Sequence, residues 1–106
     1  MKIFIVEDDL VIAESLANEL SKWNYEVHVV DNFEKIMEDF RRVEPQLVLL
    51  DINLPTLNGF HWCQEMRKVS HVPIMFISSR TDNMDQILAI QMGGDDFIEK
   101  PFNLSL

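Results

Sequence analysis

The sequence predicts an α/β fold, a doubly wound sheet of five parallel strands in the order 2-1-3-4-5. Three observations lead to this prediction. Short apolar runs alternate with segments of helical periodicity, the runs end in polar or acidic residues, and the connections between them are short. Strands and helices that alternate in this way imply parallel strands joined by right-handed crossovers. The 106 residues fit one domain.

The first two strands are expected on either side of an amphipathic helix. Residues 2–6 form a compact apolar run that stops at Glu7, Asp8 and Asp9, which predicts a buried strand with acids at its carboxyl end. The helix is predicted from apolar residues at helical spacing, namely Ile12, Leu16, Leu20 and Trp23. Residues 25–29 alternate apolar and polar, which favours a strand at the edge of the sheet.

A second helix is predicted after residue 30. Asp31 or Asn32 can cap it, and Glu34 lies at the capping-box spacing from Asp31. Its apolar stripe consists of Phe33, Ile36, Met37 and Phe40. Pro45 prevents the helix from continuing.

The third strand is the element around which the sheet is expected to form. Residues 47–50 are four consecutive apolar residues, as in a central parallel strand buried on both faces, and the run stops at Asp51. Pro55 and the Asn58-Gly59 pair then force a loop before the next helix.

The later elements repeat the pattern of apolar strand, polar end and helix. We expect a helix over 60–69, a strand over 72–77 that ends in Ser78 and Ser79, a helix from about 82 to 92 stopped by Gly93-Gly94, and a very short strand at 97–98. Residues 102–106 begin a segment too short to form a helix. Because a doubly wound sheet needs both faces covered, we expect a fragment truncated before its fifth helix.

The composition argues against several classes of function. The chain has 18 acidic and 9 basic residues, and a net charge of −9 repels nucleic acid and anionic membranes. Its longest apolar run is far below the roughly 20 residues of a membrane helix, and a signal-peptide pattern is absent. We therefore expect a cytoplasmic protein. Cys63 is expected to be a buried hydrophobe, and the three histidines lack metal-ligand spacing.

The acids at the strand ends predict a metal site. In the expected strand order the first and third strands are neighbours, so Glu7, Asp8 and Asp51 meet at the switch point of the sheet. Neighbouring carboxylates repel one another unless a cation joins them. Oxygen ligands without His or Cys favour Mg²⁺, or the similar Mn²⁺. Solvated loop acids are the alternative, but acids on two adjacent strands favour a site.

Asp51 is predicted to accept a phosphoryl group, because aspartate carboxylates form acyl phosphates in other proteins. Ser78 can donate its hydroxyl to a phosphoryl oxygen, and Lys100 offers a flexible positive charge for another. The plainer alternatives are a solvated turn serine and a surface lysine. The bond before Pro101 is a candidate cis peptide that would aim Lys100 inward.

These motifs together resemble the receiver domain of bacterial two-component response regulators, which has a flavodoxin/CheY-like fold. The resemblance covers residues 1–106 apart from the missing last helix, and the segments IVEDD, LLDINLP, ISSR and GGDDFIEKPF carry it. It implies that a sensor histidine kinase phosphorylates Asp51 and that the backbone carbonyl of Asn53 joins the metal ligands. It also implies that Ser78 and Phe97 form a switch pair. From their position beside the site, we expect Asn53 and Arg80 to tune dephosphorylation.

Arg80 and the GGDDF run make the chain most similar to the OmpR/PhoB type of transcription regulator. The segments WCQEMR, SSR and NMDQ resemble regulators of resistance to bacitracin and antimicrobial peptides. The resemblance implies a C-terminal DNA-binding domain, absent here, and a homodimer through helix 4, strand 5 and helix 5. Residues 82–92 contain no Lys or Arg, which departs from the charged pairs of such dimers.

Three alternative functions remain open. A haloacid dehalogenase-like phosphotransferase would need a second acid two residues after Asp51, where the sequence has Asn53. A flavodoxin-like cofactor binder would need a Gly-rich or Ser/Thr-rich phosphate loop where the sequence has Glu7, Asp8 and Asp9. A stand-alone receiver would act through protein contacts alone. We expect that the protein does not turn over an external substrate and is therefore not an enzyme.

Overall fold

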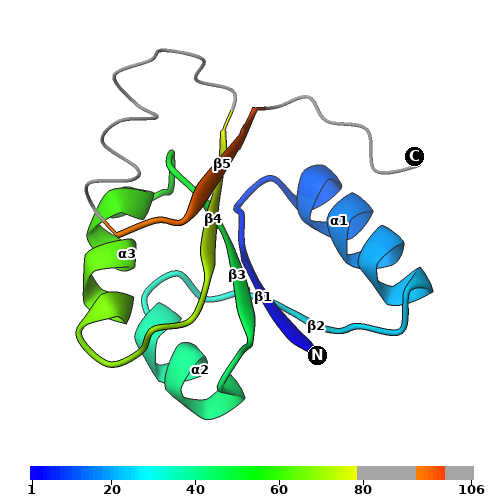
Figure 1. Ribbon diagram of the computed structural model, residues 1–106. Coiled ribbons are helices and arrows are strands. Elements are labelled where there is room, and N and C mark those ends of the chain that lie inside the picture. Colours follow the sequence, from blue (N-terminus) through cyan, green and yellow to red (C-terminus); the bar gives the residue numbers. More distant parts are fainter. Residues whose placement is uncertain (79–92, 100–106) are drawn as a thin grey trace.

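Five parallel strands form one sheet in the order β2-β1-β3-β4-β5, as predicted (Figure 1). This computed structural model describes residues 1–78 and 93–99, with side chains for 1–77 and 93–95. The elements are β1 (Lys2–Val6), α1 (Leu10–Lys22), β2 (Glu26–Val29), α2 (Ile36–Val43), β3 (Leu47–Asp51), α3 (Gly59–Arg67), β4 (Ile74–Ser78) and β5 (Asp96–Glu99). The helix predicted over 82–92 lies outside the described residues.

The described helices cover the two faces of the sheet, with α1 on one side and α2 and α3 on the other (Figure 1). Alternate residues of each strand point to opposite faces, so the sheet contributes to two apolar clusters. The cluster beneath α2 and α3 includes Phe4, Val6, Val48, Leu50, Ile74 and Phe76. The cluster beneath α1 includes Ile3, Ile5, Leu16, Leu49 and Ile77. The central strands are therefore buried on both faces, which explains their continuous apolar runs.

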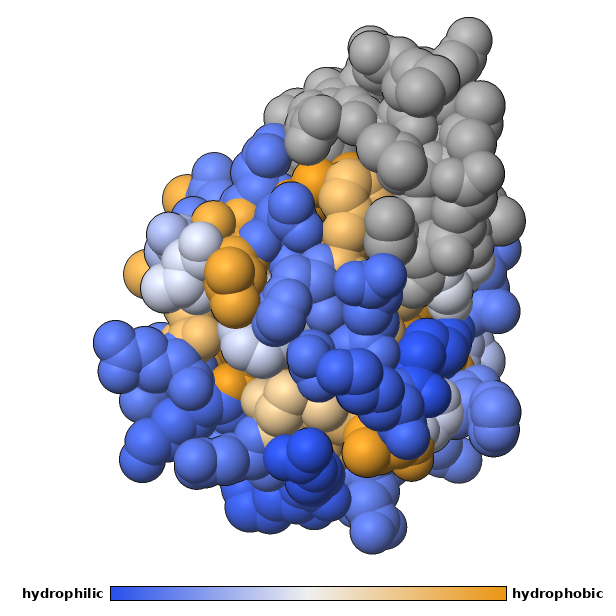
Figure 2. Space-filling model, turned by 90° about the vertical axis from the view of Figure 1, so that its left-hand side faces the viewer, coloured by the Kyte–Doolittle hydropathy of each residue, from blue (hydrophilic) through white to orange (hydrophobic). Residues whose placement is uncertain are grey.

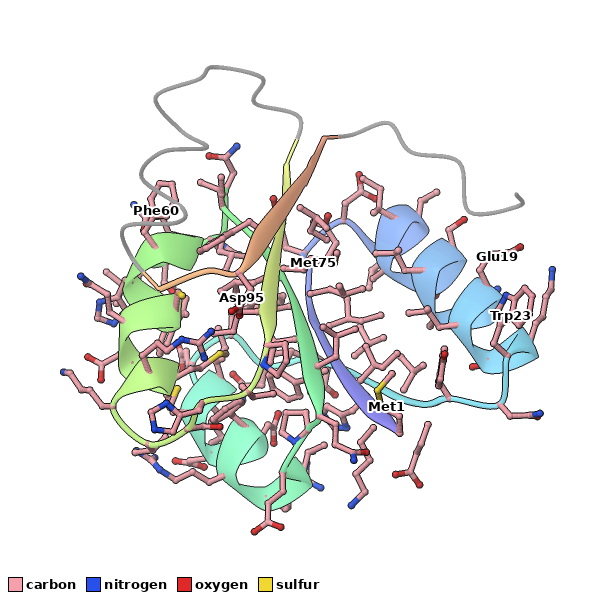
Figure 3. All side chains as sticks on the ribbon, viewed as in Figure 1. Met1, Glu19, Trp23, Phe60, Met75 and Asp95 are labelled. Carbon is pink, nitrogen blue, oxygen red and sulfur yellow. The ribbon has the colours of Figure 1, made fainter. Side chains whose placement is uncertain are left out.

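Helix α1 begins at an acid that the sequence patterns did not mark as a cap. The side chain of Asp9 accepts hydrogen bonds from the amides of Val11 at 3.0 Å and Ile12 at 3.4 Å. The prediction that Trp23 belongs to the buried stripe was wrong. Trp23 follows the last residue of the helix, its relative exposure is 68% and it points away from the sheet (Figure 3).

The predicted cap of α2 was also wrong. The helix begins at Ile36, with Lys35 in the cap position, and within the described residues no side chain bonds to this helix end. The Asn32 side chain instead accepts a hydrogen bond from the Glu34 amide at 3.0 Å. An Asn that satisfies the amide two residues ahead stabilises a turn, so the helix starts only after that turn is complete.

Strand β4 starts at Ile74, two residues later than its apolar run suggested. Pro73 has no amide to donate, and the Val72 amide donates to the Ser70 hydroxyl at 3.1 Å, so these residues form the connection from α3. The last strand, β5, begins at Asp96 and is longer than predicted. Gly93 has a positive φ of 100°, a conformation that is common just after the end of a helix.

The surface on the side of α3 is mainly hydrophilic, with separate apolar patches (Figure 2). Leu57 and Val69, which flank α3 in the sequence, are among the exposed apolar residues. This agrees with a helix that buries one stripe and exposes the other. Within the described part of the chain, no helix has both the length and the apolar character needed to cross a membrane.

Candidate functional site

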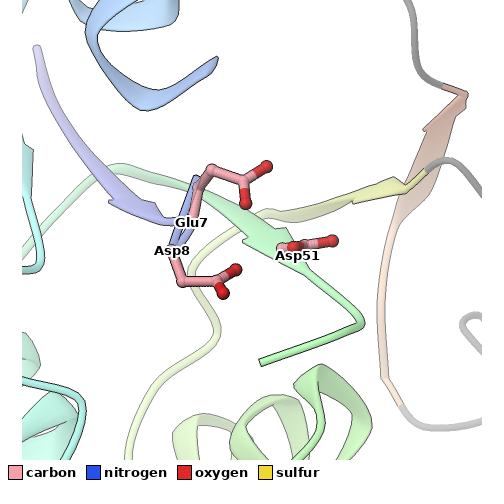
Figure 4. Close-up of side chains that lie close together, drawn as sticks. All are labelled: Glu7, Asp8 and Asp51. Carbon is pink, nitrogen blue, oxygen red and sulfur yellow. The ribbon is translucent and has the colours of Figure 1, made fainter. Parts of the chain in front are cut away.

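The pairing of β1 with β3 brings three carboxylates to one edge of the sheet. Val6 pairs with Leu50, so Glu7 and Asp8 leave β1 beside the point where β3 ends at Asp51. One carboxylate oxygen from each acid lies within 4.8 Å of the others. Figure 4 shows the side chains of Glu7 and Asp8 extending from the end of β1 beside Asp51. The predicted meeting of these acids is therefore observed.

The three acids differ in burial. Glu7 and Asp51 have relative exposures of 1% and 4%, whereas Asp8 is exposed. The backbone amide of Asp9 donates to a carboxylate oxygen of Glu7 at 3.2 Å. Ionised carboxylates are rarely buried unless they are paired, hydrogen-bonded or bound to a metal, because desolvation of a charge is costly. Two nearly buried acids at neighbouring strand ends, with a third acid beside them, are typical of a site that binds positive charge.

The donor set of this site fits a hard divalent cation. The described residues that lie close enough to share a metal ion are Glu7, Asp8 and Asp51, and each offers a carboxylate oxygen. Oxygen-only ligands favour Mg²⁺, which is bound by one or two carboxylates together with waters and phosphate oxygens. The exposure of Asp8 leaves one side of the site open to solvent, from which a phosphate-bearing molecule can approach.

The loop from β3 to α3 is closed by hydrogen bonds next to Asp51. The Gly59 amide donates to the carbonyl oxygen of Ile52 at 2.8 Å. The Asn58 side chain caps α3 by accepting from the His61 amide at 3.1 Å. The first of these bonds ties the start of α3 to the end of β3, whereas the second lies within the helix itself. Asn53 is exposed in the loop between β3 and α3.

The other predicted site residues lie partly outside the described structure. Ser78 is the last residue of β4, the neighbour of β3, and Phe97 lies in β5 opposite Phe76 in the register. Only the backbone of Ser78 and Phe97 is described. Arg80, Lys100 and Pro101 lie outside the described residues, and their predicted roles stay predictions.

Two residues next to the acids were missed in the sequence. The sequence pattern places Asp9 with the acids at the end of β1, but its side chain caps α1. Its position directly before a helical pattern was the available signal, since Asp is a favoured N-cap. The Asn58-Gly59 pair predicts only a turn, whereas Gly59 begins α3 and packs against Asp51. The sequence carries no signal for that contact.

Fold and site together define a doubly wound α/β protein with an acidic cluster at the switch point of its sheet. Within this class, the chain belongs to the family described as "Response regulator receiver domain", which matches residues 3–106.

Individual relatives support this assignment. The sensory transduction protein BceR of Halalkalibacterium halodurans is 46% identical over 105 residues, which cover 99% of this chain and 46% of BceR. The response regulator protein GraR of Staphylococcus aureus is 44% identical over 102 residues, which cover 96% of this chain and 46% of GraR. This chain thus spans about half the length of these curated relatives.

Solved structures agree in fold and sequence. The N-terminal domain of NsrR, a lantibiotic response regulator for nisin resistance, has a TM-score of 0.89 at 49% identity, covering 98% of this chain and 88% of that chain. A two-component response regulator from Clostridium difficile has a TM-score of 0.94 at 26% identity, covering 98% and 86%. The predicted resemblance to receiver domains, and to regulators of antimicrobial-peptide resistance, is confirmed.

Proposed function

We propose that Asp51 is the phosphoacceptor of this receiver domain and that Mg²⁺, or Mn²⁺, binds at Glu7, Asp8 and Asp51 together with the backbone carbonyl of Asn53. The observation that carries the proposal is the convergence of three carboxylates from two neighbouring strand ends within 4.8 Å. A bound cation would neutralise charge on the phosphoryl oxygens and on the acids around them.

Asp51 would act as the nucleophile. A carboxylate oxygen of Asp51 forms a bond to phosphorus, while the bond from phosphorus to the donor nitrogen of a kinase histidine breaks and that nitrogen takes up a proton. Such transfer depends mainly on positioning and charge neutralisation. The near-complete burial of Asp51 supports this role, because a buried carboxylate in a rigid central strand has a well-defined position.

Ser78 and Lys100 would hold the phosphoryl oxygens after transfer, through a hydroxyl donor and a positive charge respectively. The place of Ser78 at the end of β4, beside β3, supports its part in this proposal. Movement of Ser78, coupled to the ring of Phe97, would favour one packing of the surface around β5. Asn53 and Arg80 would set the rate at which water removes the phosphoryl group.

The relatives support a proposal about the larger protein in which this domain works. Because this chain spans about half the length of BceR and GraR, we propose that it works in a larger transcription regulator with a C-terminal DNA-binding domain. A sensor histidine kinase in the cytoplasm would be the phosphoryl donor. Phosphorylation would promote a homodimer through helix 4, strand 5 and helix 5. The similarity to NsrR supports a role in resistance to antimicrobial peptides.

Phosphorylation by a small donor tests the proposal. The protein is incubated with acetyl phosphate and Mg²⁺, and its intact mass is measured for the wild type, Asp51→Asn and Asp9→Asn. Asp9→Asn is a matched control, because it removes one acid beside the site while Asn can still cap α1. We expect the wild type and Asp9→Asn to gain one phosphoryl group and Asp51→Asn to gain none. A gain that persists in Asp51→Asn contradicts the proposal.

A further inference from the structure

Gly59, the first residue of α3, packs directly against the backbone of Asp51. A Cβ atom on Gly59 would lie 2.1 Å from the carbonyl oxygen of Asp51, 3.0 Å from its carbonyl carbon and 3.1 Å from Cα of Ile52. All three neighbours are backbone atoms at the end of the central strand. Unlike the tip of a flexible side chain, they cannot turn aside, so any side chain at position 59 requires α3 or the end of β3 to shift.

The requirement for glycine comes from space and not from backbone conformation. Among the described glycines, the positive φ occurs at Gly93 and not at Gly59. An alanine at position 59 could therefore adopt the φ that Gly59 has. The conflict is confined to the contact of its methyl group with Asp51 and Ile52.

The end of β3 has little freedom to move away. Leu50 pairs with Val6 of β1, and Asp51 pairs with Ile77 of β4, so strands hold β3 on both sides. Ile52 is fully buried in the apolar core. The start of α3 is also held in place, because the Gly59 amide donates to the Ile52 carbonyl oxygen. A movement of α3 away from Asp51 and Ile52 would break this hydrogen bond.

We infer that Gly59 is a positioning residue for phosphoryl transfer. Because Gly59 has no side chain, α3 can pack directly against Asp51, and this packing fixes the position of the Asp51 carboxylate relative to Glu7 and Asp8. The inference rests on the proposed function of Asp51. Ordinary contact begins near 3.4 Å, so a methyl group at 2.1 Å must displace its surroundings by about 1 Å. A displacement of that size lowers the rate of a positioned reaction by on the order of 100-fold.

The test compares Gly59→Ala with two control variants of the same helix. Asn58→Ala removes the cap of α3, and Met66→Ala creates space at a buried position far along the helix, but neither adds an atom near Asp51. The initial rate of phosphate gain from acetyl phosphate at saturating Mg²⁺ and the thermal midpoint are measured for each. An excluded osmolyte such as trimethylamine N-oxide is added until circular dichroism shows every variant folded.

We expect Gly59→Ala to be phosphorylated at least about 10-fold more slowly than both controls. Its thermal midpoint is expected to lie at or above that of Met66→Ala, so that lost stability does not account for the lost rate. A second readout is the amide NMR shift of Asp51 and Ile52 without metal, which should change in Gly59→Ala and stay unchanged in Asn58→Ala.

Equal phosphorylation rates in Gly59→Ala and Asn58→Ala, with unchanged shifts at Asp51, would overturn the inference and leave the role of Asp51 intact. A wild-type protein that gains no phosphoryl group would overturn the proposed function instead. The two failures are therefore distinguishable.

Discussion

Cys63 shows how burial decides the chemistry of a single residue. It lies on the inner face of α3 with no exposed surface, which confirms the prediction of a buried hydrophobe. Burial raises the pKa of the Cys63 thiol to about 11, because the thiolate would lose its hydration, and Asp95 acts in the same direction while Arg67 opposes it. The thiol is therefore uncharged at neutral pH, which favours a packing role over redox chemistry.

The raised pKa of Cys63 predicts a loss of stability at alkaline pH. The folded protein holds the thiol proton more tightly than the unfolded chain, whose thiol has a pKa near 9.0. The stabilisation is therefore complete below pH 9 and is lost as pH rises through about 11. In urea titrations from pH 8 to 11.5, the wild type should lose more unfolding free energy than Cys63→Ala. Parallel curves for the two proteins would contradict this expectation, because the two proteins differ only at position 63.

At the scale of elements, the side chain of Arg67 joins the end of α3 to the start of β4 and to residues 93–95. From the end of α3, its guanidinium donates to the carbonyl oxygens of Gly93 at 2.8 Å and Val72, and to a carboxylate oxygen of Asp95 at 2.8 Å. The same Asp95 oxygen accepts from the Ile74 amide at 2.7 Å, where β4 begins. Asp95 lies among these segments in Figure 3. This Arg67 network anchors the start of β5 beside β4.

Removal of the Arg67 network should destabilise the fold. Arg67→Met keeps most of the apolar stem but removes the side-chain donor to two carbonyl oxygens and one of the two donors to the Asp95 carboxylate, so we expect a loss of about 2 kcal/mol of unfolding free energy. The ion pair itself contributes little of this, because the Asp95 side chain is 58% exposed. The measurement is urea unfolding followed by circular dichroism.

Lys68→Met is the matched control for the Arg67 network. Lys68 is the next residue, and its side chain is 68% exposed in a pair with Glu65 that spans a single helical turn. Surface substitutions of this kind change stability by about 0.5 kcal/mol or less. An equal effect of Arg67→Met and Lys68→Met would show that the network does not hold the strands together.

At the scale of the whole molecule, the acidic edge adds to an already negative protein. The net charge is −9, and three carboxylates that share one edge of the sheet repel one another in the folded state more than in the extended chain. A cation that binds this edge only in the folded state would therefore raise the stability of the whole domain.

Mg²⁺ is predicted to raise the thermal midpoint. At ten times its dissociation constant, binding adds about 1.4 kcal/mol. For a domain of this size that corresponds to a shift of roughly 5 to 10 °C. Differential scanning calorimetry with NaCl at equal ionic strength separates binding from screening. The shift should be largely lost in Asp8→Asn and kept in Asp9→Asn, and an equal shift in the two variants would place the cation elsewhere.

The sequence by itself determined the strands, their order and the acidic edge. The apolar run 47–50 reflects a strand buried on both faces, and the helical spacing in 10–22 reflects a helix buried on one face. Both patterns can be recognised from neighbouring residues alone. In the predicted parallel topology the first and third strands are neighbours, so acids at their carboxyl ends must lie close together. The meeting of Glu7, Asp8 and Asp51 could therefore be predicted.

The tertiary structure alone decided features that depend on partners distant in sequence. Trp23 is exposed although it continues the apolar spacing of α1, because neighbours outside the local pattern determine which side chains are covered. Arg67 meets Asp95 across 28 residues, and Gly59 meets the carbonyl oxygen of Asp51 across a loop. These contacts follow from how the packed elements fit together, and periodicity carries no information about that fit.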